Sequence, residues 1–403
     1  MTRMPIAAHL TGPWRAVPIL GFTQIVGWGS TFYAIGVLKS FIAAETGWSP
    51  VMVVAGISIS FAAGGMIAPL VGRTIASRGG RMVMASGSIV TGISVAGLYF
   101  VENEIAWLAL WAIIGISQAM NLYDAAFATL AEIFGSRARA AITALTLFAG
   151  FASTVFWPLT FLLNESFGWR ETWLIYGALN LFLCAPLHAF ALPRSGAGVG
   201  SLTRDQETSS AALKLLPPSG LPFVLLAAAF SVNTFFMSAF AVHLVGLLEQ
   251  VGLAAAAAVA AGALVGPAQV AGRLAEFVFA RKRHPIEVAV FTMLLMPASF
   301  ILLAFGGAKV AIAFTIGYGV SQGLLTIVRG TVPLALFGAS GFAIVLGRLA
   351  APVLVAQAIA PVAFGYALQL WVPQTVLLVS FAVGLCSFAA VCWLAYRLRR
   401  QTP

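Results

Sequence analysis

The sequence predicts an all-α membrane protein with twelve transmembrane helices in two pseudo-symmetric six-helix bundles. Of its 403 residues, 61% are hydrophobic and only 8% are charged, whereas a soluble domain carries roughly 25% charged residues. Its apolar runs reach the ~20 residues that one bilayer crossing needs. The two halves also repeat each other, since Gly115-Ile116-Ser117-Gln118 recurs as Gly319-Val320-Ser321-Gln322. Duplicated bundles of membrane helices are the architecture of secondary transporters.

Twelve apolar runs account for the predicted helices, six before and six after the longest polar stretch of the chain. In order, they cover residues 16–41, 51–71, 82–101, 105–133, 140–163, 172–192, 222–248, 253–280, 285–305, 309–336, 342–368 and 373–396. The polar stretch is rich in Gly, Ser, Thr and Pro, which is typical of a linker. We therefore expect an N-terminal bundle over residues 1–192, a cytoplasmic linker over 193–220 and a C-terminal bundle over 221–403.

The distribution of basic residues predicts the orientation of the helices. The net charge is +10, and sixteen of the 22 Lys and Arg fall in the loops and tails on one side of the predicted bundles. Cytoplasmic loops carry such an excess in membrane proteins, so both termini are expected inside the cell. The basic charge therefore indicates a membrane orientation and not a nucleic-acid partner. We expect a monomeric, multi-pass protein of a bacterial-type plasma (inner) membrane, with the lipid bilayer as its surroundings.

The predicted loop between helices 2 and 3 carries a motif of Gly and Arg that a later loop repeats. The first copy includes Gly72, Arg73, Arg78 and Arg81, and the second includes Gly272, Glu276 and Arg281. The first copy resembles the signature Gly-x-Leu-Ala-Asp-Arg-x-Gly-Arg-Arg of the major facilitator superfamily. Ser77 stands where the family has Asp, whereas the second copy keeps an acid at that place. The resemblance implies the major facilitator fold, with both motifs acting in gating.

Three further segments resemble one branch of that superfamily, the monocarboxylate transporters and the related oxalate/formate exchangers. They are Gly47-Trp48-Ser49, Asn121-Leu122 and Gly168-Trp169-Arg170, which match in place and order. The resemblance implies a carrier of small carboxylates that works by alternating access.

Arg273 is a candidate for binding an anionic substrate. It lies ~12 Å along predicted helix 8 from the inner loop, and a guanidinium can hold a carboxylate with two parallel hydrogen bonds. It falls where the monocarboxylate and oxalate carriers have their substrate-binding Arg. Gln269 stands where monocarboxylate transporters have an Asp on the same helix face. The alternative is that Arg273 only extends to the inner membrane surface.

Tyr33 on predicted helix 1 matches the substrate-contacting Tyr of the same carriers. Four residues later these carriers have a Lys that handles the proton, but this chain has Val37. The resemblance therefore does not support proton coupling through that Lys, and a coupled proton is left open as a partner.

Predicted helices 4 and 10 each carry a charge beside polar side chains. Gln118, Asn121 and Asp124 share one stripe at helical spacing, and Gln322 shares another with Arg329. Both helices line the central cavity in the superfamily, so the resemblance implies that these stripes contact substrate. Two interpretations stay open: a charge pair or proton site that takes part in transport, or a static pair that only locks the inner side.

These residues favour a carrier for a small organic anion, because Arg273 and Arg329 outnumber the buried acid Asp124. The alternative, an efflux carrier for drug-like compounds, would be expected to have an acid in its cavity that no basic residue compensates. Efflux of a small inorganic oxyanion or metalloid would suit the same arginines. A membrane-embedded enzyme or sensor is a remote alternative, since the isolated His188 and His243 and the dispersed cysteines provide no nucleophile–base pair and no metal cluster. We expect no enzyme, no cofactor and no metal site.

Overall fold

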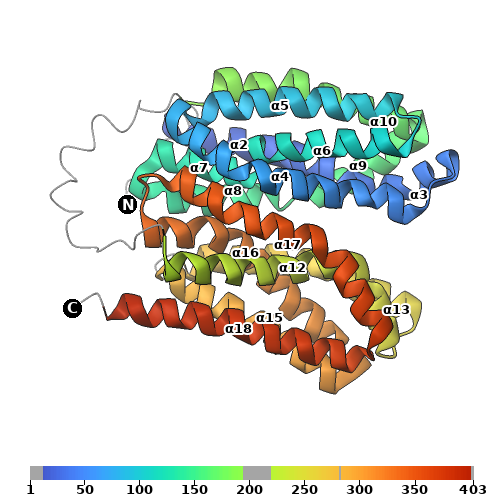
Figure 1. Cartoon of the computed structure of the whole chain (residues 1–403), viewed down its shortest axis with the longest axis vertical. Helices are drawn as coiled ribbons and strands as arrows, with labels where there is room; N and C mark the ends of the chain where they lie inside the picture. The colour runs from blue at the N-terminus through green and yellow to red at the C-terminus, as the bar shows by residue number, and fades with distance from the viewer. Residues whose placement is uncertain (1–11, 194–218, 281–282, 401–403) are drawn as a thin grey trace. The chain divides into compact units, whose positions relative to one another are not determined.

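The computed structural model describes residues 12–193, 219–280 and 283–400, and over these ranges the chain forms helices and turns with no β-strand (Figure 1). Residues 194–218, which make up most of the predicted linker, and Arg281 lie outside the described residues. The chain divides into two compact units. The first comprises Met1–Ala211 and Gly338–Ala351, and the second comprises Ala212–Phe337 and Pro352–Pro403.

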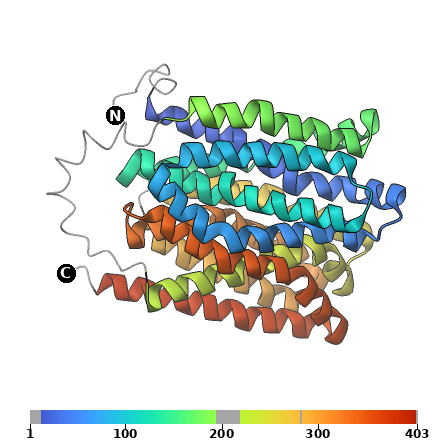
Figure 2. The same cartoon turned by 45° about the horizontal axis from the view of Figure 1, so that its top comes forward.

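The first unit is built from long helices that run roughly alongside one another in both views (Figure 1 and Figure 2). Its helices are α2 (Ala16–Trp28), the π-helical turn η2 (Gly29–Tyr33), α3 (Ala34–Thr46), α4 (Pro50–Arg78), α5 (Gly80–Gly97), α6 (Glu104–Asn121), α7 (Tyr123–Phe134), α8 (Ala138–Ala149), α9 (Ala152–Phe167), α10 (Trp169–Leu179) and the π-helical turns η5 (Asn180–Cys184) and η6 (Leu187–Ala191).

The second unit repeats this plan with its own set of long helices. They are α12 (Leu221–Gln250), α13 (Ala255–Ala263), α14 (Val265–Ala275), the π-helical turn η8 (Glu276–Ala280), α15 (Pro285–Gly306), α16 (Ala311–Phe337), α17 (Phe342–Leu370) and α18 (Pro373–Arg399). The first part of α17 groups with the first unit, and the rest of this helix groups with the second.

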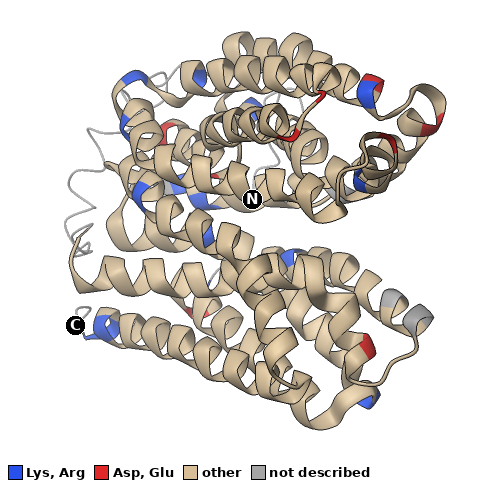
Figure 3. Cartoon of the chain, turned by 45° about the vertical axis from the view of Figure 1, so that its right-hand side comes forward, with Lys and Arg blue, Asp and Glu red and all other residues tan. Residues whose placement is uncertain are grey.

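Among the described residues, ten helical stretches are long and apolar enough to cross a membrane. One of them, Pro285–Phe337, contains both α15 and α16. The predicted eighth helix corresponds to α13 and α14, which are divided at Leu264. The helices therefore agree with the twelve that the sequence predicts. Most of the ribbon carries no charged residue, and the charged segments gather towards helix ends (Figure 3).

The repeated sequence Gly-x-Ser-Gln makes equivalent contacts in the two units. A Cβ at Gly115 of α6 would overlap the Ser60 carbonyl group of α4, and a Cβ at Gly319 of α16 would lie 2.8 Å from the Val265 carbonyl oxygen of α14. In both units a glycine thus allows two helices to approach closely, because it has no side chain. Two residues further on, Ser117 accepts a hydrogen bond from Thr91, as Ser321 donates one to the Thr292 carbonyl.

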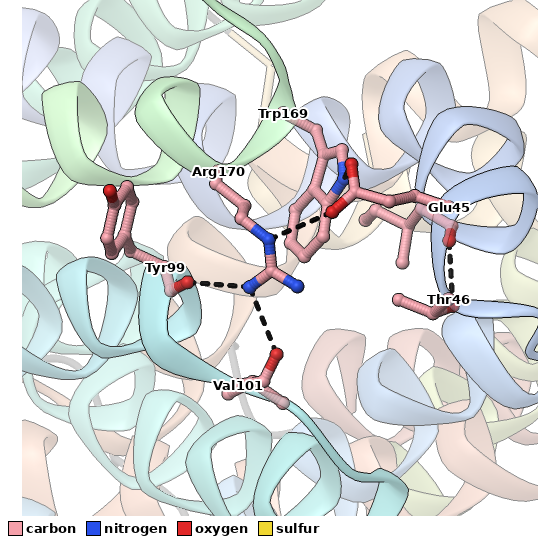
Figure 4. A network of polar contacts seen from close by, with 7 residues as sticks. Glu45, Thr46, Tyr99, Val101, Trp169 and Arg170 are labelled. Atoms are coloured by element: carbon pink, nitrogen blue, oxygen red, sulfur yellow. Dashed lines mark hydrogen bonds and ion pairs between the residues drawn. The ribbon is translucent and has the colours of Figure 1, made fainter.

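An ion pair joins the ends of three helical segments of the first unit (Figure 4). The Nε atom of Arg170 donates to Glu45 at 3.0 Å, and its Nη1 atom donates to the carbonyl groups of Tyr99 and Val101. The indole of Trp169 donates to the same carboxylate at 2.7 Å. The Gly168-Trp169-Arg170 segment therefore holds the end of α3 and the chain after α5 against the start of α10. We call Glu45, Trp169 and Arg170 the clasp.

Candidate functional site

Arg273 lies in the last turn of α14, where this helix packs tightly against α16. A Cβ at Gly323 of α16 would overlap the Gln269 carbonyl group, so the two backbones are in direct contact. The side chain of Arg273 is only 5% exposed. The side chain of Arg273 is therefore buried within the structure.

The contacts of Arg273 are all with neutral groups. Its Nε atom donates to Thr326 Oγ1 at 3.1 Å and to the Gly323 carbonyl at 3.4 Å, and its Nη2 atom donates to Gln269 Oε1 at 3.4 Å. Among the described residues no carboxylate forms an ion pair with Arg273. A buried charge is costly unless an opposite charge compensates it. The second unit therefore holds a guanidinium that is oriented by neutral groups and has no counter-ion there.

The other predicted residues of the second unit are placed differently from one another. Gln269 is half-buried and bonds Arg273, as described above. Gln322 is 1% exposed, and its Nε2 atom lies 4.0 Å from the sulfur of Met296 on α15, so its amide points into the core of the unit. Arg329 is half-buried on α16, on the turn after Thr326. Gln269 and Arg273 thus form one group, and Gln322 is not part of it.

Tyr33 is the last residue of the π-helical turn η2 in helix 1 and is half-buried. Its ring packs edge-on against Trp157 of α9, with 6.0 Å between centroids, and against Phe32 at 5.2 Å. π-Helical turns are rare and often occur at functional sites. The apolar sequence of helix 1 gave no signal for this turn.

The predicted stripe on helix 4 is interrupted, because this helix breaks at Leu122. The residue is extended (φ −90°, ψ −160°), so that Asn121 ends α6 and Asp124 lies in the first turn of α7. The amide of Gln24 donates to the Asn121 carbonyl at 2.8 Å and so satisfies a group that the break exposes. Asp124 is half-buried beside the N-terminus of α7, where the helix dipole favours a negative charge. Discontinuous membrane helices commonly form transport sites.

Asn121 points into the first unit and takes part in a buried polar network. Its Nδ2 atom donates to Thr91 at 3.0 Å and to Ser88 at 3.4 Å. His188 of η6 continues the network, with 2.9 Å from Nδ1 to Ser88 Oγ and 2.9 Å from Nε2 to Thr23 Oγ1. All five side chains are less than 5% exposed. Their shared burial was not visible in the sequence, because they come from four helices.

Gln118 is the remaining predicted residue of helix 4, and it too is largely buried. Its side chain is 8% exposed, one turn before Asn121 on α6. The predicted residues of the first unit therefore divide into a half-buried group, Tyr33 and Asp124, and a buried group, Gln118 and Asn121.

The first loop motif forms contacts within its own unit. Arg81 donates to the Ala189 carbonyl at 2.6 Å, and the backbone amide of Gly80 donates to the carboxylate of Glu132 at 3.1 Å. The hydroxyl of Ser77 bonds only the Thr74 carbonyl of its own helix among its described contacts. Glu132 of α7 therefore provides a carboxylate at this loop, where the superfamily signature has an Asp in place of Ser77.

The remaining motif residues differ mainly in burial. Gly72 and Gly272 are buried against neighbouring helices, and Glu276 is 3% exposed in the π-helical turn η8. Arg73 and Arg78 are exposed. Within the described ranges, no group of three or more His, Cys, Asp or Glu could hold a metal ion.

Comparisons with known proteins identify relatives by family and by fold. The family model of the Major Facilitator Superfamily matches residues 20–346. The structure is similar to that of the human organic anion transporter MFSD10 (TETRAN), with a TM-score of 0.71 and 17% identity, over 96% of this chain and 100% of that chain. It is also similar to the proton:xylose symporter XylE bound to 6-bromo-6-deoxy-D-glucose, with a TM-score of 0.71 and 11% identity, over 95% of each chain. No curated protein sequence matches.

Proposed function

Because the chain belongs to the Major Facilitator Superfamily, a family of transporters and not of enzymes, we propose that it is a secondary active carrier for a small organic anion. The chain is a multi-pass integral membrane protein of this family, and small-molecule transport is its general function. The proposed part is the substrate class, together with transport by alternating access as in the monocarboxylate branch.

The observation that carries this proposal is the environment of Arg273. Its guanidinium is buried, oriented by Thr326, Gly323 and Gln269, and without a carboxylate partner among the described residues. A bound carboxylate would supply the missing negative charge and accept two parallel hydrogen bonds. Such an arrangement favours anions over sugars or cations. The structural similarity to an organic anion transporter is compatible with this choice, but the equally similar sugar symporter means that the fold alone does not decide it.

Thermal stabilisation of the purified protein by candidate ligands tests the substrate class. We expect carboxylates such as acetate and benzoate to raise the melting temperature, because a ligand that binds only the folded state stabilises it. Matched concentrations of arsenate and of the lipophilic cation tetraphenylphosphonium serve as comparisons. Stabilisation by the cation and not by any carboxylate would refute an anion carrier, and stabilisation by arsenate alone would favour the inorganic oxyanion alternative.

We further propose that Asp124 carries the coupled proton if transport is proton-driven. The supporting observations are its half-buried position after the break of helix 4 and the presence of Val37 at the place of the family's Lys. Asp124→Asn should then abolish accumulation driven by a pH gradient in proteoliposomes but keep exchange of substrate for substrate. Accumulation at the wild-type rate in this variant would exclude the role.

The proposed orientation places both termini in the cytoplasm of a bacterial-type cell. Glu104 begins α6 and Arg137 lies between α7 and α8, so the two mark opposite ends of helix 4. A membrane-impermeant thiol reagent added to cells should label Glu104→Cys and not Arg137→Cys. Labelling of Arg137→Cys alone would reverse the orientation.

A further inference from the structure

We infer that the second unit binds the headgroup of an anionic glycerophospholipid, such as phosphatidylglycerol, in a pocket between α15 and α18. The pocket lies where α15 begins and α18 ends, and its volume is about 250 Å³. Its lining residues, which we call the headgroup pocket, are Arg283, Glu287, Val290, Ala395 and Arg399. All of them belong to the second unit, and the pocket is distinct from the site proposed around Arg273.

Two guanidinium groups share one carboxylate in the headgroup pocket. The Nη1 atom of Arg283 lies 3.7 Å from Oε2 of Glu287, and the Nη2 atom of Arg399 lies 3.8 Å from Oε1 of the same side chain. Both distances are longer than the ~2.7–2.9 Å of a charge-assisted hydrogen bond. The lining residues carry one more positive than negative charge. This charge favours an anion, and the planar fork of a guanidinium matches the oxygens of a phosphate group.

The lining of the headgroup pocket changes from charged to apolar along the two helices. Arg283, Glu287 and Arg399 form the part at the helix ends, and Val290 and Ala395 lie about one turn further into α15 and α18. Both helices belong to stretches that are long and apolar enough to cross a membrane, so the apolar part lies towards the bilayer core. A phospholipid has the same order of groups, with its phosphate outside and its hydrocarbon inside.

Two aromatic residues place the end of α18 at the level of lipid headgroups. Trp and Tyr are enriched where a membrane meets water, and Trp393 and Tyr396 lie in the last two turns of this helix. The Cζ atom of Arg397 lies 5.2 Å from the Trp393 ring centroid, and that of Arg400 lies 4.6 Å from the Tyr396 ring centroid. These cation–π contacts hold two further positive charges at the end of α18, where basic residues gather in Figure 3.

The size and exposure of the headgroup pocket fit a lipid headgroup better than an enclosed solute. The side chains of Arg283 and Arg399 are 73% and 77% exposed, so a lipid can reach them from the membrane surface. The pocket is also smaller than the ~300–1,000 Å³ of sites that enclose a drug-sized ligand. It therefore suits one phosphodiester group whose acyl chains stay in the bilayer. Basic pockets between membrane helices bind headgroups of anionic lipids in this way.

Dissociation constants of short-chain phosphatidylglycerol and phosphatidylcholine with identical acyl chains, measured on the purified protein in neutral detergent, test the inference. Phosphatidylglycerol should bind about tenfold more tightly, because the choline cation of the other lipid is repelled by the arginines. Arg399→Gln should remove most of this preference, and Glu287→Gln should strengthen it by removing the carboxylate that repels a phosphate. Lys309→Gln, at an exposed residue beyond the opposite end of α15, is the matched control and should change neither constant.

Three outcomes would overturn the headgroup pocket. The first is equal binding of the two lipids, or an unchanged preference in Arg399→Gln. The second is binding of inorganic phosphate as tight as that of phosphatidylglycerol, which would indicate a site for a free anion. The third is weaker binding of phosphatidylglycerol in Glu287→Gln. The carboxylate affinity that the proposed function assigns to Arg273 should be the same in Arg399→Gln as in the wild type, so the two proposals fail separately.

Discussion

Arg73 and Arg273 follow the same dipeptide pattern, a buried glycine and then an arginine, yet they occupy opposite environments. Arg73 is exposed, whereas Arg273 is 5% exposed. Gly72 packs against the start of α17, where a Cβ would lie 3.1 Å from the Gly347 Cα. Gly272 packs instead against Val320 of α16, where an added Cβ would lie 3.0 Å from the Val320 carbonyl oxygen. The two copies of the motif therefore pack against different helices, and only the second places its arginine in a buried position.

Helices 4 and 10 differ in a second way, although both carry Gly-x-Ser-Gln. Helix 4 breaks at Leu122, and α16 runs without interruption from Ala311 to Phe337. The first unit therefore provides a helix end with an acid in its first turn, and the second provides an unbroken helix that accepts two hydrogen bonds from Arg273. Duplication has preserved the packing contacts of the two units, while their charged groups have diverged.

The largest expected effect is on transport and distinguishes the two arginines. Arg273→Gln should lower carboxylate transport in proteoliposomes by ~10- to 100-fold, because it removes charge-assisted hydrogen bonds to the substrate. Arg73 belongs to the predicted gating motif, so the matched readout for Arg73→Gln is binding: its dissociation constant for the carboxylate should stay within about twofold, since the side chain is exposed. Equal losses of carboxylate affinity in the two variants would contradict a substrate-binding role for Arg273.

The helix contacts that the repeat preserves should respond alike in both units. Gly319→Ala and Gly115→Ala should each lower the free energy of unfolding by about 3 kcal/mol, because the new Cβ would overlap a backbone carbonyl group that cannot move aside. Gly246→Ala is the control, since no atom lies within 4 Å of its added Cβ in α12. That change should stabilise the protein by ~0.5–1 kcal/mol. Thermal unfolding in detergent measures the stability of all three variants. If one of the two contact glycines can be replaced by Ala without loss of stability, the helices of that unit pack more loosely than the structure shows.

Replacing His188 should give a smaller loss of stability, through contacts that occur only in the first unit. It connects Thr23 of helix 1 to Ser88 of helix 3, whereas Asn233 makes the comparable connections in the second unit, to Met293 and Ser387. His188→Leu should cost about 1 kcal/mol for each of the two hydrogen bonds that it loses. Thermal unfolding should show this shift at neutral pH. An unchanged melting temperature would indicate that Ser88 and Thr23 find other partners.

The clasp should give the smallest effect. Glu45 is 53% exposed and Arg170 27% exposed as side chains, and exposed ion pairs contribute ~0.2–1 kcal/mol. Glu45→Gln should therefore lower the melting temperature slightly, and the difference from the wild type should shrink in high salt. A large decrease that does not depend on salt would point to the Trp169 indole bond as the main contribution of the clasp.

Sequence reasoning predicted the parts of the fold that depend on hydrophobicity and repetition. The apolar runs, the duplicated Gly-x-Ser-Gln segments and the buried position of Arg273 all follow from composition and spacing. The break at Leu122 and the π-helical turn η2 could not be predicted, since no Pro stands at either point and both apolar runs continue beyond it. Their causes are tertiary: Gln24 satisfies the carbonyl that the break exposes, and Phe156 packs against Gly29.

The candidate site could be predicted one residue at a time but not as a set of contacts. Arg273 and Gln269 were predicted together through the resemblance to the monocarboxylate transporters, which have an Asp at the place of Gln269, four residues before the Arg. Their orienting partners Gly323 and Thr326 lie on α16, and only the packing of two helices brings them near. Asn121 and Gln322 share a helix stripe with charged residues, but their amides point into the core of each unit. A stripe pattern shows which face is polar, not which polar group remains free to bind.

The binding affinity of carboxylates for Arg273→Lys tests the central claim most directly. Lysine keeps the charge but cannot form the planar pair of hydrogen bonds. Isothermal titration of acetate and of benzoate should therefore give dissociation constants raised about tenfold or more in Arg273→Lys, and constants equal to the wild type in Arg73→Lys. Wild-type affinity for both acids in a folded Arg273→Lys protein would contradict the assignment of Arg273 as the carboxylate-binding residue.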